Sequence, residues 1–271
     1  MAAKKPQSNS KARTSAQESR PGRPRLLGTV AVVTGASRGI GFAIARTLAS
    51  EGCSVVITGR DAAALSKSAA ELRRVLPKQT PARDKSGAQI VAEVCDVRDA
   101  DSIAALFAMV KQRLSRLDVL VNNAGIAQPA VAIEQTSLDI WRDAIDTNLT
   151  GLFLCTRAAL PLMQAGATII NNLSVAARTV FPNFAAYNAS KHGALGFTLS
   201  LREELIPRGI RVMALMPGAT ATDMWDQIMP DAPRERMIDV ASVAQAVLCA
   251  VLLPPNANLS ELLLAPTGGA L

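Results

Sequence analysis

The sequence predicts an α/β protein built on one doubly wound parallel sheet of about seven strands, with helices on both faces. Three observations support this fold class. Short β-branched runs alternate with longer segments of helical period along the chain. The runs are almost continuously apolar, as expected of parallel strands that are covered on both faces. No internal repeat and no Gly/Pro-rich linker divides the chain after residue 26, so we expect a single domain.

The expected elements follow one another as strand, helix, strand to the end of the chain. The apolar runs cover residues 28–34, 54–58, 89–94, 118–122, 167–174, 210–216 and 261–265. The helical patterns cover about 39–50, 61–76, 99–114, 137–162, 186–206 and 240–252. A helix between successive strands is the connection that parallel strands require. The polar segment PKQTPARDKSG, residues 77–87, predicts a surface loop between a helix and the third strand.

The basic charge of the chain is concentrated at one end. Residues 1–25 contain seven Lys or Arg residues and one Glu, so they carry +6 of the net charge of +7. This segment lacks the apolar stretch of a secretory signal, and its Ser, Pro and Lys content predicts a disordered leader. An organelle transit peptide and a minor-groove contact through RPGRPR are the alternatives. The folded body, 26–271, is nearly neutral, so nucleic acid is not an expected partner of it.

Apolar length and cysteine spacing exclude two further classes. No apolar run reaches the ~18 residues that a membrane span needs, so we expect no membrane partner and a cytoplasmic location. Cys53, Cys95, Cys155 and Cys249 lie far apart, without CxxC spacing, beside a single histidine, His192. They predict buried free thiols in a reducing compartment and no metal site.

A glycine-rich turn, TGASRGIG at residues 34–41, joins the first strand to the first helix. Its G-x-x-x-G-x-G spacing differs from the usual G-x-G-x-x-G, but the physical role is the same. Glycines allow a tight turn and bring backbone N–H groups and a helix N-terminus close to a pyrophosphate. The turn therefore indicates a Rossmann-type dinucleotide site, although packing alone also accounts for such turns.

The end of the second strand, VVITGRD, distinguishes between the two nicotinamide cofactors. An NAD site carries an acidic residue there for the ribose 2′-hydroxyl, whereas this chain has Gly59 followed by Arg60. Arg60 and Arg38, from the glycine turn, are suited to clamp a 2′-phosphate through their planar sets of donors. NADP(H) is therefore the predicted cofactor.

A candidate acid–base pair lies in FAAYNASKHGAL, residues 184–195, which contains the only tyrosine. Tyr187 and Lys191 are four residues apart, so on a helix their side chains project from the same face. A free phenol titrates near 10, and nearby positive charge is needed to bring its pKa toward neutrality. Lys191 supplies such a charge. His192 points elsewhere on the helix and is expected to serve packing or the surface.

The ordered motifs define a resemblance. The chain carries TGASRGIG, CDV at 95–97, NNAG at 122–125, DTNLTG at 146–151, Ser174, YNASK at 187–191 and PG at 217–218. With these motifs it resembles, from about residue 26 to 271, the classical short-chain dehydrogenase/reductase family. The cofactor-binding positions that the resemblance implies are Gly35, Ser37, Arg38, Gly39, Ile40, Gly41, Arg60, Asp96, Val97, Asn123, Ala124, Gly125, Tyr187, Lys191, Pro217, Gly218 and Thr222.

The same resemblance implies a catalytic set of Ser174, Tyr187, Lys191 and Asn148. Tyr187 would exchange a proton with the carbonyl or alcohol oxygen of a small substrate, and Ser174, 13 residues earlier, would hydrogen-bond that oxygen. Lys191 would also hold the nicotinamide ribose, and Asn148 would support a water-mediated proton relay. The resemblance further implies a homotetramer or homodimer formed through the helices near 99–162 and 186–206.

The sequence predicts the substrate less well than it predicts the cofactor. Ala177 stands where many relatives carry glycine, the stretch after Pro217 is shorter than in acyl-carrier-protein reductases, and the ending LLLAPTGGAL lacks their closing pattern. These departures count against a role in fatty-acid synthesis. Four apolar residues after Pro217 fit an apolar lid, ordinary packing or a subunit contact equally well; they are Met224, Trp225, Ile228 and Met229.

Three functions compete at this point. The first is an NADP(H)-dependent oxidoreductase of a ketone, aldehyde or 3-oxo compound. The second is an NADP(H)-binding scaffold or sensor whose basic leader binds a polyanion. The third, a sugar-nucleotide epimerase, is disfavoured by the length of the chain and by the glycine spacing.

Overall fold

Seven parallel strands form one sheet in the computed structural model, which describes residues 24–77 and 87–269. The strands are β1 (Val30–Val33), β2 (Ser54–Gly59), β3 (Ile90–Val94), β4 (Val119–Asn122), β5 (Thr168–Asn172), β6 (Arg211–Pro217) and β7 (Glu261–Leu264). Their order across the sheet is β3-β2-β1-β4-β5-β6-β7. The predicted doubly wound fold is therefore confirmed. Residues 1–23 of the expected leader and 78–86 of the expected loop lie outside the described residues.

The order of the strands reverses between β1 and β4. Val32 of β1 pairs with Val56 of β2 on one side and with Leu120 of β4 on the other. The connections from β1 and from β4 therefore leave in opposite directions, and a crevice opens outside the carboxyl ends of these strands. The glycine turn follows β1, and the NNAG segment begins at the end of β4. The topology thus brings the two motifs to one edge of the sheet.

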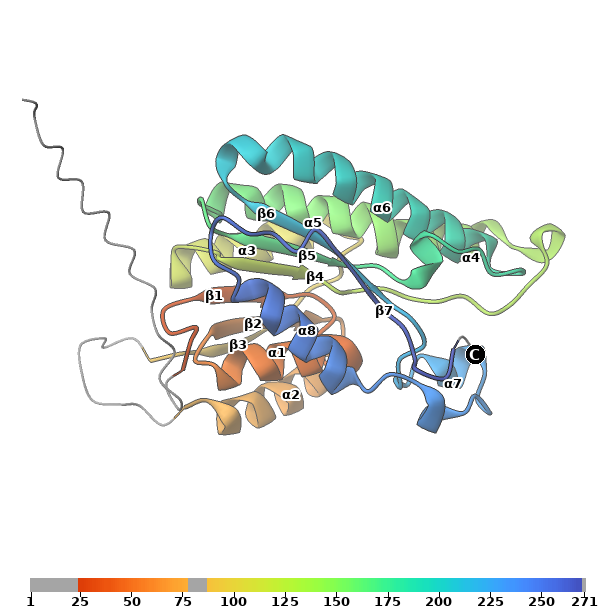
Figure 1. The fold of residues 1–271 in the computed structure, drawn as a ribbon, viewed down its shortest axis with the longest axis horizontal. Helices are drawn as coiled ribbons and strands as arrows, with labels where there is room; N and C mark the ends of the chain where they lie inside the picture. Colours follow the sequence, from red (N-terminus) through yellow and green to blue (C-terminus); the bar gives the residue numbers. More distant parts are fainter. Residues whose placement is uncertain (1–23, 78–86, 270–271) are drawn as a thin grey trace, which may run out of the picture.

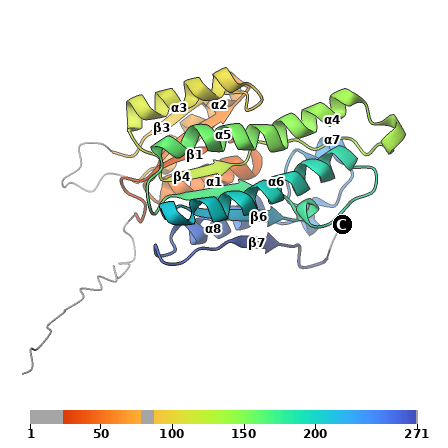
Figure 2. The same cartoon turned by 90° about the horizontal axis from the view of Figure 1, so that it is seen from above.

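Helices cover both faces of the sheet, as Figures 1 and 2 show. One layer contains α1 (Gly39–Ser50), α2 (Ala62–Val75) and α8 (Val240–Val251), whose buried side chains pack with those of the central strands. The other contains α3 (Ala100–Leu114), α5 (Gly151–Ala159) and α6 (Ala185–Leu205). Both cores consist mainly of Val, Ile, Leu and Ala, as a chain poor in aromatic residues requires.

The helix expected over 137–162 is not one regular helix. It begins as α4 (Leu138–Ile145), continues as a π-helical turn at Asp146–Thr150, and resumes as α5 before a 3₁₀ turn at Leu160–Leu162. The backbone stays helical throughout, so the periodicity of the sequence was read correctly and only the change of hydrogen-bond spacing was missed. π-turns within helices often occur at functional sites, and this one contains Asn148.

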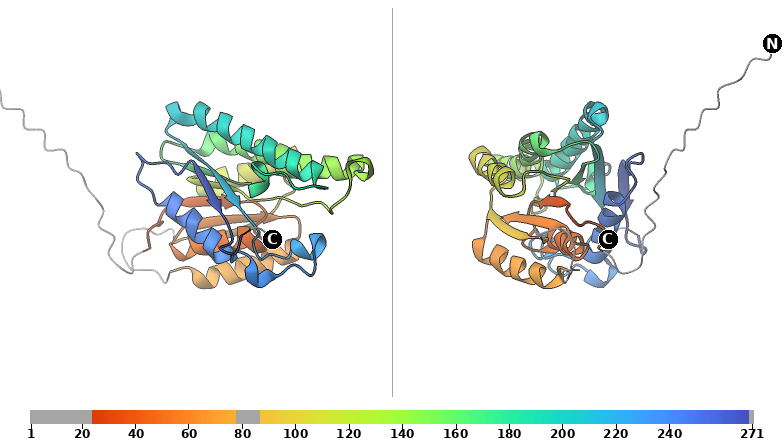
Figure 3. Two further views of the ribbon diagram at one scale, coloured as in Figure 1. Left: turned by 45° about the vertical axis from the view of Figure 1, so that its right-hand side comes forward. Right: turned by 90° about the vertical axis from the view of Figure 1, so that its left-hand side faces the viewer.

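The segment after β6 extends beyond the carboxyl edge of the sheet. It contains the short helix α7 (Trp225–Ile228) and a bridge between Thr220 and Ile238. In Figure 3 it lies apart from the two helical layers, near the end of the described chain. Trp225 Nε1 donates to Thr220 O at 2.9 Å, so the indole is anchored to the base of this segment.

The folded body begins slightly before the expected boundary at residue 26. Arg25 is paired with Glu51 through its guanidinium and its backbone N–H, and Leu26 is buried. Pro24 also packs near Gly52. In the described part of the chain, no helix combines the length and apolar character needed to cross a membrane.

Candidate active site

The glycine turn adopts backbone conformations that favour glycine. Gly35 and Gly39 have φ angles of +63° and +59°. A Cβ on Gly35 would lie 2.8 Å from Ala124 Cα, and one on Gly41 would lie 2.3 Å from Asn123 Nδ2 and 2.6 Å from Gly35 O. The turn and the NNAG segment are therefore in direct contact. Glycine is required here both for the turn and for this close approach.

The NNAG segment also braces the turn through hydrogen bonds. Thr34 Oγ1 accepts from the backbone N–H groups of Asn123 and Ala124, both at 3.0 Å. Asn123 Nδ2 donates to Thr34 O at 2.9 Å and to Gly35 O at 3.1 Å. The segment therefore stabilises the turn, and the backbone of residues 123–125 lies at the edge of the sheet where a dinucleotide would bind.

The start of α1 has the features of a phosphate site. Its N-cap residue, Arg38, makes no side-chain cap, so its side chain leaves the first-turn N–H groups free for an external acceptor. The guanidinium of Arg38 is 70% exposed and stands 3.8 Å from Asp223 of the C-terminal segment. Arg60 is also exposed and lies at the end of β2. Both arginines are accessible to an anion, and Gly59, the last residue of β2, carries no charge.

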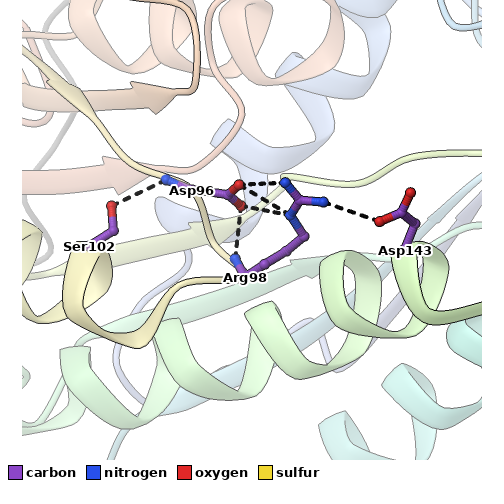
Figure 4. A network of polar contacts seen from close by, with 4 residues as sticks. All are labelled: Asp96, Arg98, Ser102 and Asp143. Atoms are coloured by element: carbon purple, nitrogen blue, oxygen red, sulfur yellow. Dashed lines mark hydrogen bonds and ion pairs between the residues drawn. The ribbon is translucent and has the colours of Figure 1, made fainter. Parts of the chain in front are cut away.

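A charged network marks the adenine end of the expected cofactor site (Figure 4). The guanidinium of Arg98 is bidentate to the carboxylate of Asp96, at 2.7 and 3.1 Å, and also donates to Asp143 of α4 at 3.2 Å. The Arg98 guanidinium holds the pKa of Asp96 below its ordinary value. The backbone N–H of Asp96 donates to Ser102 Oγ at 3.3 Å. Asp96 is therefore held as a fixed, ionised acceptor.

Val97 is buried beside Asp96 and packs against the glycine at the start of α5. A Cβ on Gly151 would lie 2.8 Å from both Val97 Cγ2 and Val97 O. This contact fixes the loop after β3 against α5.

Tyr187 and Lys191 lie on one face of α6, one turn apart, as predicted. Lys191 Nζ stands 5.6 Å from the centre of the Tyr187 ring. Lys191 is buried, and its Nζ donates to Asn172 O at 3.4 Å. A Cβ on Gly125 would lie 3.6 Å from the same Nζ, so the NNAG segment forms one wall of the lysine site. Ser174 follows β5, and its hydroxyl also accepts from Ala176 N at 3.1 Å.

The pKa of Tyr187 differs from the sequence-based expectation. Burial raises the pKa of this phenol above its ordinary value, and a hydrogen bond with Ser174 opposes the rise to a smaller extent. Burial also lowers the pKa of Lys191 to about 8. The pKa of Tyr187 is therefore raised and not lowered as the sequence predicted, because the loss of solvation is the larger effect. At neutral pH the phenol is protonated, which is the state of a proton donor.

Asn148 lies in the π-turn with its side chain fully engaged. Its Oδ1 accepts from Ile126 N at 2.8 Å, and its Nδ2 donates to Ile126 O at 2.9 Å and to Ser190 Oγ at 3.0 Å. The side chain thus ties the loop after β4 to α6. This places Asn148 next to the Tyr187 helix, and its hydrogen bonds give it a positioning role.

Of the remaining predicted cofactor residues, Pro217 is the last residue of β6, and Gly218 and Thr222 follow it. Gly218 N donates to Leu264 O at 2.7 Å, which anchors this turn to β7. A Cβ on Gly39 would lie 3.5 Å from Thr222 Cγ2, so Thr222 reaches the glycine turn. Met224 and Met229 are exposed, whereas Trp225 and Ile228 are half-buried. The lid, packing and contact interpretations of these four residues all remain compatible with this placement.

Two polar residues at the site were not found by sequence reasoning. Gln128 is buried, and its Oε1 accepts from Tyr187 N at 2.8 Å. Asn172 donates through Nδ2 to Asn123 Oδ1 at 2.8 Å, while its own Oδ1 is buried without a partner in the described part of the chain. Neither residue belongs to a motif with a fixed spacing, so no signal in the sequence identified them.

The predicted burial of free cysteines is confirmed for three of the four. All four cysteines are free, and Cys53, Cys95 and Cys155 are buried. Cys249 is exposed on α8, so its predicted burial is wrong: its position falls on the outer side of an otherwise apolar helix. His192 is exposed, with Nδ1 2.9 Å from Asn188 O. Residues 24–77 and 87–269 contain no group of three or more His, Cys, Asp or Glu residues placed to hold a metal.

Comparison with known proteins gives consistent results. A family model described as short chain dehydrogenase matches residues 29–233. A 3-oxoacyl-[acyl-carrier-protein] reductase of Synechocystis sp. is 40% identical over 75% of this chain and 78% of its own. A 3beta-hydroxysteroid dehydrogenase of Mediterraneibacter gnavus is 36% identical over 79% of this chain and 73% of its own.

Solved structures agree with the sequence relatives. A metagenomic short-chain oxidoreductase, crystallised in complex with NADP, is 33% identical to this chain. It superposes with a TM-score of 0.75 over 89% of this chain and 98% of its own. The likeness therefore extends over most of this chain and nearly all of the other.

Proposed function

This chain belongs to the short-chain dehydrogenase family, and from that premise we propose that it is an NADP(H)-dependent oxidoreductase. The proposed reaction interconverts a ketone, aldehyde or 3-oxo compound and the corresponding alcohol. The observation that carries the proposal is the buried Lys191 ammonium on the same helical face as Tyr187, 5.6 Å from its ring, with Ser174 close enough to lower the pKa of the phenol. That arrangement supplies a proton, a second donor to an oxygen, and a fixed positive charge.

The proposed cofactor site is supported by the fit between the glycine turn and a dinucleotide. Gly35 and Gly41 leave no room for side chains, and Gly39 has a positive φ that favours glycine, so the backbone and the N-terminus of α1 can approach a pyrophosphate. Arg38 and Arg60 are exposed, and the last residue of β2, Gly59, is neutral, which favours a 2′-phosphate. Asp96, oriented by Arg98, would accept from an adenine amine.

Within this proposal the chain performs the proton transfer. When bound, NADPH supplies the hydride that reduces the carbonyl carbon. Tyr187 donates its phenolic proton to the carbonyl oxygen, and Ser174 donates a hydrogen bond that holds that oxygen. Lys191 stabilises the phenolate that remains, and its ammonium group would hold the nicotinamide ribose. Asn148 supports the proton path from Lys191 through the loop that it fixes at Ile126.

The substrate remains a carbonyl class. The two curated relatives carry different names, one for a reductase of acyl-carrier-protein thioesters and one for a steroid dehydrogenase, so their likeness does not select a substrate. The segment after Pro217 carries exposed Met224 and half-buried Trp225 beside the charged Asp223 and Asp226, so its side chains do not select a substrate either. We propose a ketone, aldehyde or 3-oxo compound as the substrate class.

We also infer that the enzyme acts as a homotetramer or homodimer in the cytoplasm. The outer faces of α4 and α5 expose Trp141 and Phe153, each 40% accessible, and Phe153 stacks edge-to-face with Phe197 of α6. Large apolar side chains on neighbouring helices are typical of subunit contacts.

The decisive experiment is a panel of ketones, aldehydes, 3-oxo esters and sugars assayed with NADPH and with NADH. We expect NADPH oxidation with at least one carbonyl, and weaker turnover with NADH. Tyr187→Phe should lower kcat by at least ~100-fold, because proton transfer by a positioned side chain contributes about that much. Its affinity for NADPH should stay within about twofold, since the phenol is not a phosphate ligand. Equal turnover by Tyr187→Phe would show that the proposed mechanism is wrong.

A further inference from the structure

The backbone N–H of Tyr187 has an unusual partner. Tyr187 is the third residue of α6, and N–H groups in the first turn of a helix have no acceptor within it. The N-cap residue, Phe184, makes no side-chain hydrogen bond. The acceptor is Gln128 Oε1, at 2.8 Å, from a residue 59 positions earlier in the chain. A distant side chain therefore caps the helix at the candidate catalytic residue itself.

The loop that carries Gln128 is held firmly on both sides of it. Before Gln128, Ile126 is bonded through both its N–H and its carbonyl to the side chain of Asn148. After it, Val131 N donates to Asn183 O at 2.9 Å, in the segment that leads into α6. Gln128 itself is 4% exposed. The buried Gln128 side chain thus connects the loop after β4 to the first turn of α6, and both segments are held by further hydrogen bonds.

The carbonyl of Tyr187 belongs to the same network. It accepts from Ser190 Oγ at 2.8 Å, and Ser190 Oγ in turn accepts from Asn148 Nδ2 at 3.0 Å. Both polar groups of the Tyr187 backbone are therefore bonded to side chains, and both connect to the loop after β4. Gln128 closes this ring of hydrogen bonds.

The other end of the Gln128 amide has no partner. Its Nε2 is buried and lacks an acceptor among the residues that the structure describes. A buried donor without an acceptor lowers stability. Fold stability alone therefore does not explain why residue 128 is a glutamine. The hydrogen bond that Gln128 Oε1 accepts from Tyr187 N does explain it.

We propose that Gln128 is a positioning residue, whose Oε1 fixes the first turn of α6 and so sets the phenol of Tyr187 against Ser174 and Lys191. The effect on catalysis rests on the proposed function, but the effect on Tyr187 does not. A displacement of reacting groups by about 1 Å can lower a rate by about 100-fold. The hydrogen bond from Gln128 acts directly on the backbone of Tyr187, so its loss can displace the phenol by such a distance.

Three variants of the full-length protein separate the oxygen from the rest of the side chain. Gln128→Met keeps the length of the side chain but removes the acceptor. Gln128→Glu keeps an acceptor oxygen and adds a negative charge. Gln135→Met is the matched control, because Gln135 lies in the same connection but is exposed. If Gln128→Met does not fold, Gln128→Asn, whose acceptor is too short to reach, replaces it.

Two measurements are made on each variant. Tyr187 is the only tyrosine, so protein labelled with ¹³C at the tyrosine Cζ alone gives one resonance, which is titrated with pH. Steady-state kinetics with NADPH and the best carbonyl of the panel give kcat and KM. We expect Gln128→Met to move or broaden the tyrosine resonance and to lower kcat about tenfold or more, with KM for NADPH within about twofold. Gln128→Glu should restore kcat to within about threefold and raise the Tyr187 pKa, because a carboxylate disfavours a nearby phenolate.

Each outcome bears on the proposal. It is overturned if Gln128→Met leaves the resonance and kcat like those of Gln135→Met, or if Gln128→Glu is impaired as severely as Gln128→Met. If the wild-type protein reduces no carbonyl, the proposed function fails while the resonance still decides the positioning role. An unmoved resonance would then overturn that role, and a moved one, recovered in Gln128→Glu, would support it.

Discussion

Lys191 holds an ammonium group in surroundings that disfavour its charge. Only 6% of the residue is exposed, and in the described part of the chain its Nζ makes one hydrogen bond, a long one of 3.4 Å to Asn172 O. Burial lowers its pKa from 10.5 to about 8, so the folded state binds this proton less tightly than the unfolded state does. In the proposed enzyme Lys191 binds the cofactor and stabilises the phenolate. Burial of its charge lowers the stability of the folded protein.

We therefore expect Lys191→Met to stabilise the cofactor-free protein at pH 7. The pKa difference corresponds to up to about 3 kcal/mol of unfolding free energy, which is present in full below about pH 8. Between about pH 8 and 10.5 the folded state loses the proton first, so the wild type gains stability relative to the variant. Urea unfolding of both proteins across this range should show the difference shrinking as pH rises.

The control for this prediction is Lys111→Met, because Lys111 is exposed on α3. Its unfolding free energy should stay within about 0.5 kcal/mol of the wild type at every pH. A Lys191→Met protein that is less stable than the wild type at pH 7, or a difference independent of pH, would contradict the assigned burial cost.

At the level of residues, the sequence predicts what local spacing determines. The four-residue separation puts Tyr187 and Lys191 on one helical face, and the structure has them there. The direction of the Tyr187 pKa was missed because it depends on burial by segments that are remote in sequence. Gln128 was missed for the same reason: its contact with Tyr187 spans 59 residues and follows no periodicity.

Among the elements, the glycine turn and the NNAG segment form one unit that neither motif reveals alone. Their contact is so close that Gly41 has no space for even one carbon atom beside Asn123. The strand and helix ranges predicted from hydrophobic period agree with the structure, because buried faces impose that period directly. The π-turn at Asp146–Thr150 was not predicted, since one extra residue in a helical turn leaves the apolar pattern almost unchanged.

Gly41→Ala tests this unit against a matched helical glycine. The new Cβ would lie 2.3 Å from Asn123 Nδ2 and 2.6 Å from Gly35 O, so we expect a loss of about 1–3 kcal/mol in unfolding free energy. NADPH affinity should fall as well, because the backbone at the phosphate site must shift. Gly196→Ala, on α6, meets no atom within 4 Å and should gain about 0.5–1 kcal/mol. Urea unfolding gives the unfolding free energy, and NADPH fluorescence titration gives the affinity. If both are unchanged in Gly41→Ala, the glycine turn and the NNAG segment do not form one unit.

At the scale of the whole molecule, the fold class and the strand alternation followed from the sequence, and the distribution of charge separates two functions. A nearly neutral body that carries the candidate site is joined to a basic leader. An enzyme needs only the first, whereas a polyanion-dependent scaffold or sensor needs both. The structure refines where they divide, because Pro24 packs near Gly52 and Arg25 pairs with Glu51. A truncation after residue 23 therefore removes leader charge without disturbing the body, whereas one after residue 25 also removes an ion pair.

Deletion of residues 1–23 is expected to leave turnover within about twofold of the full chain, because every residue of the candidate site lies beyond the cut. The deletion removes six basic residues and Glu18, which takes the net charge from +7 to +2. Binding to heparin at low salt should be lost with it, since such binding depends on the number of cations that displace counterions. A full-length variant with those six basic residues changed to Gln keeps the leader length and should behave like the deletion. If heparin instead changes the NADPH affinity of the full chain but not of either variant, the leader and the nucleotide site are coupled, and the sensor function is favoured over the simple enzyme.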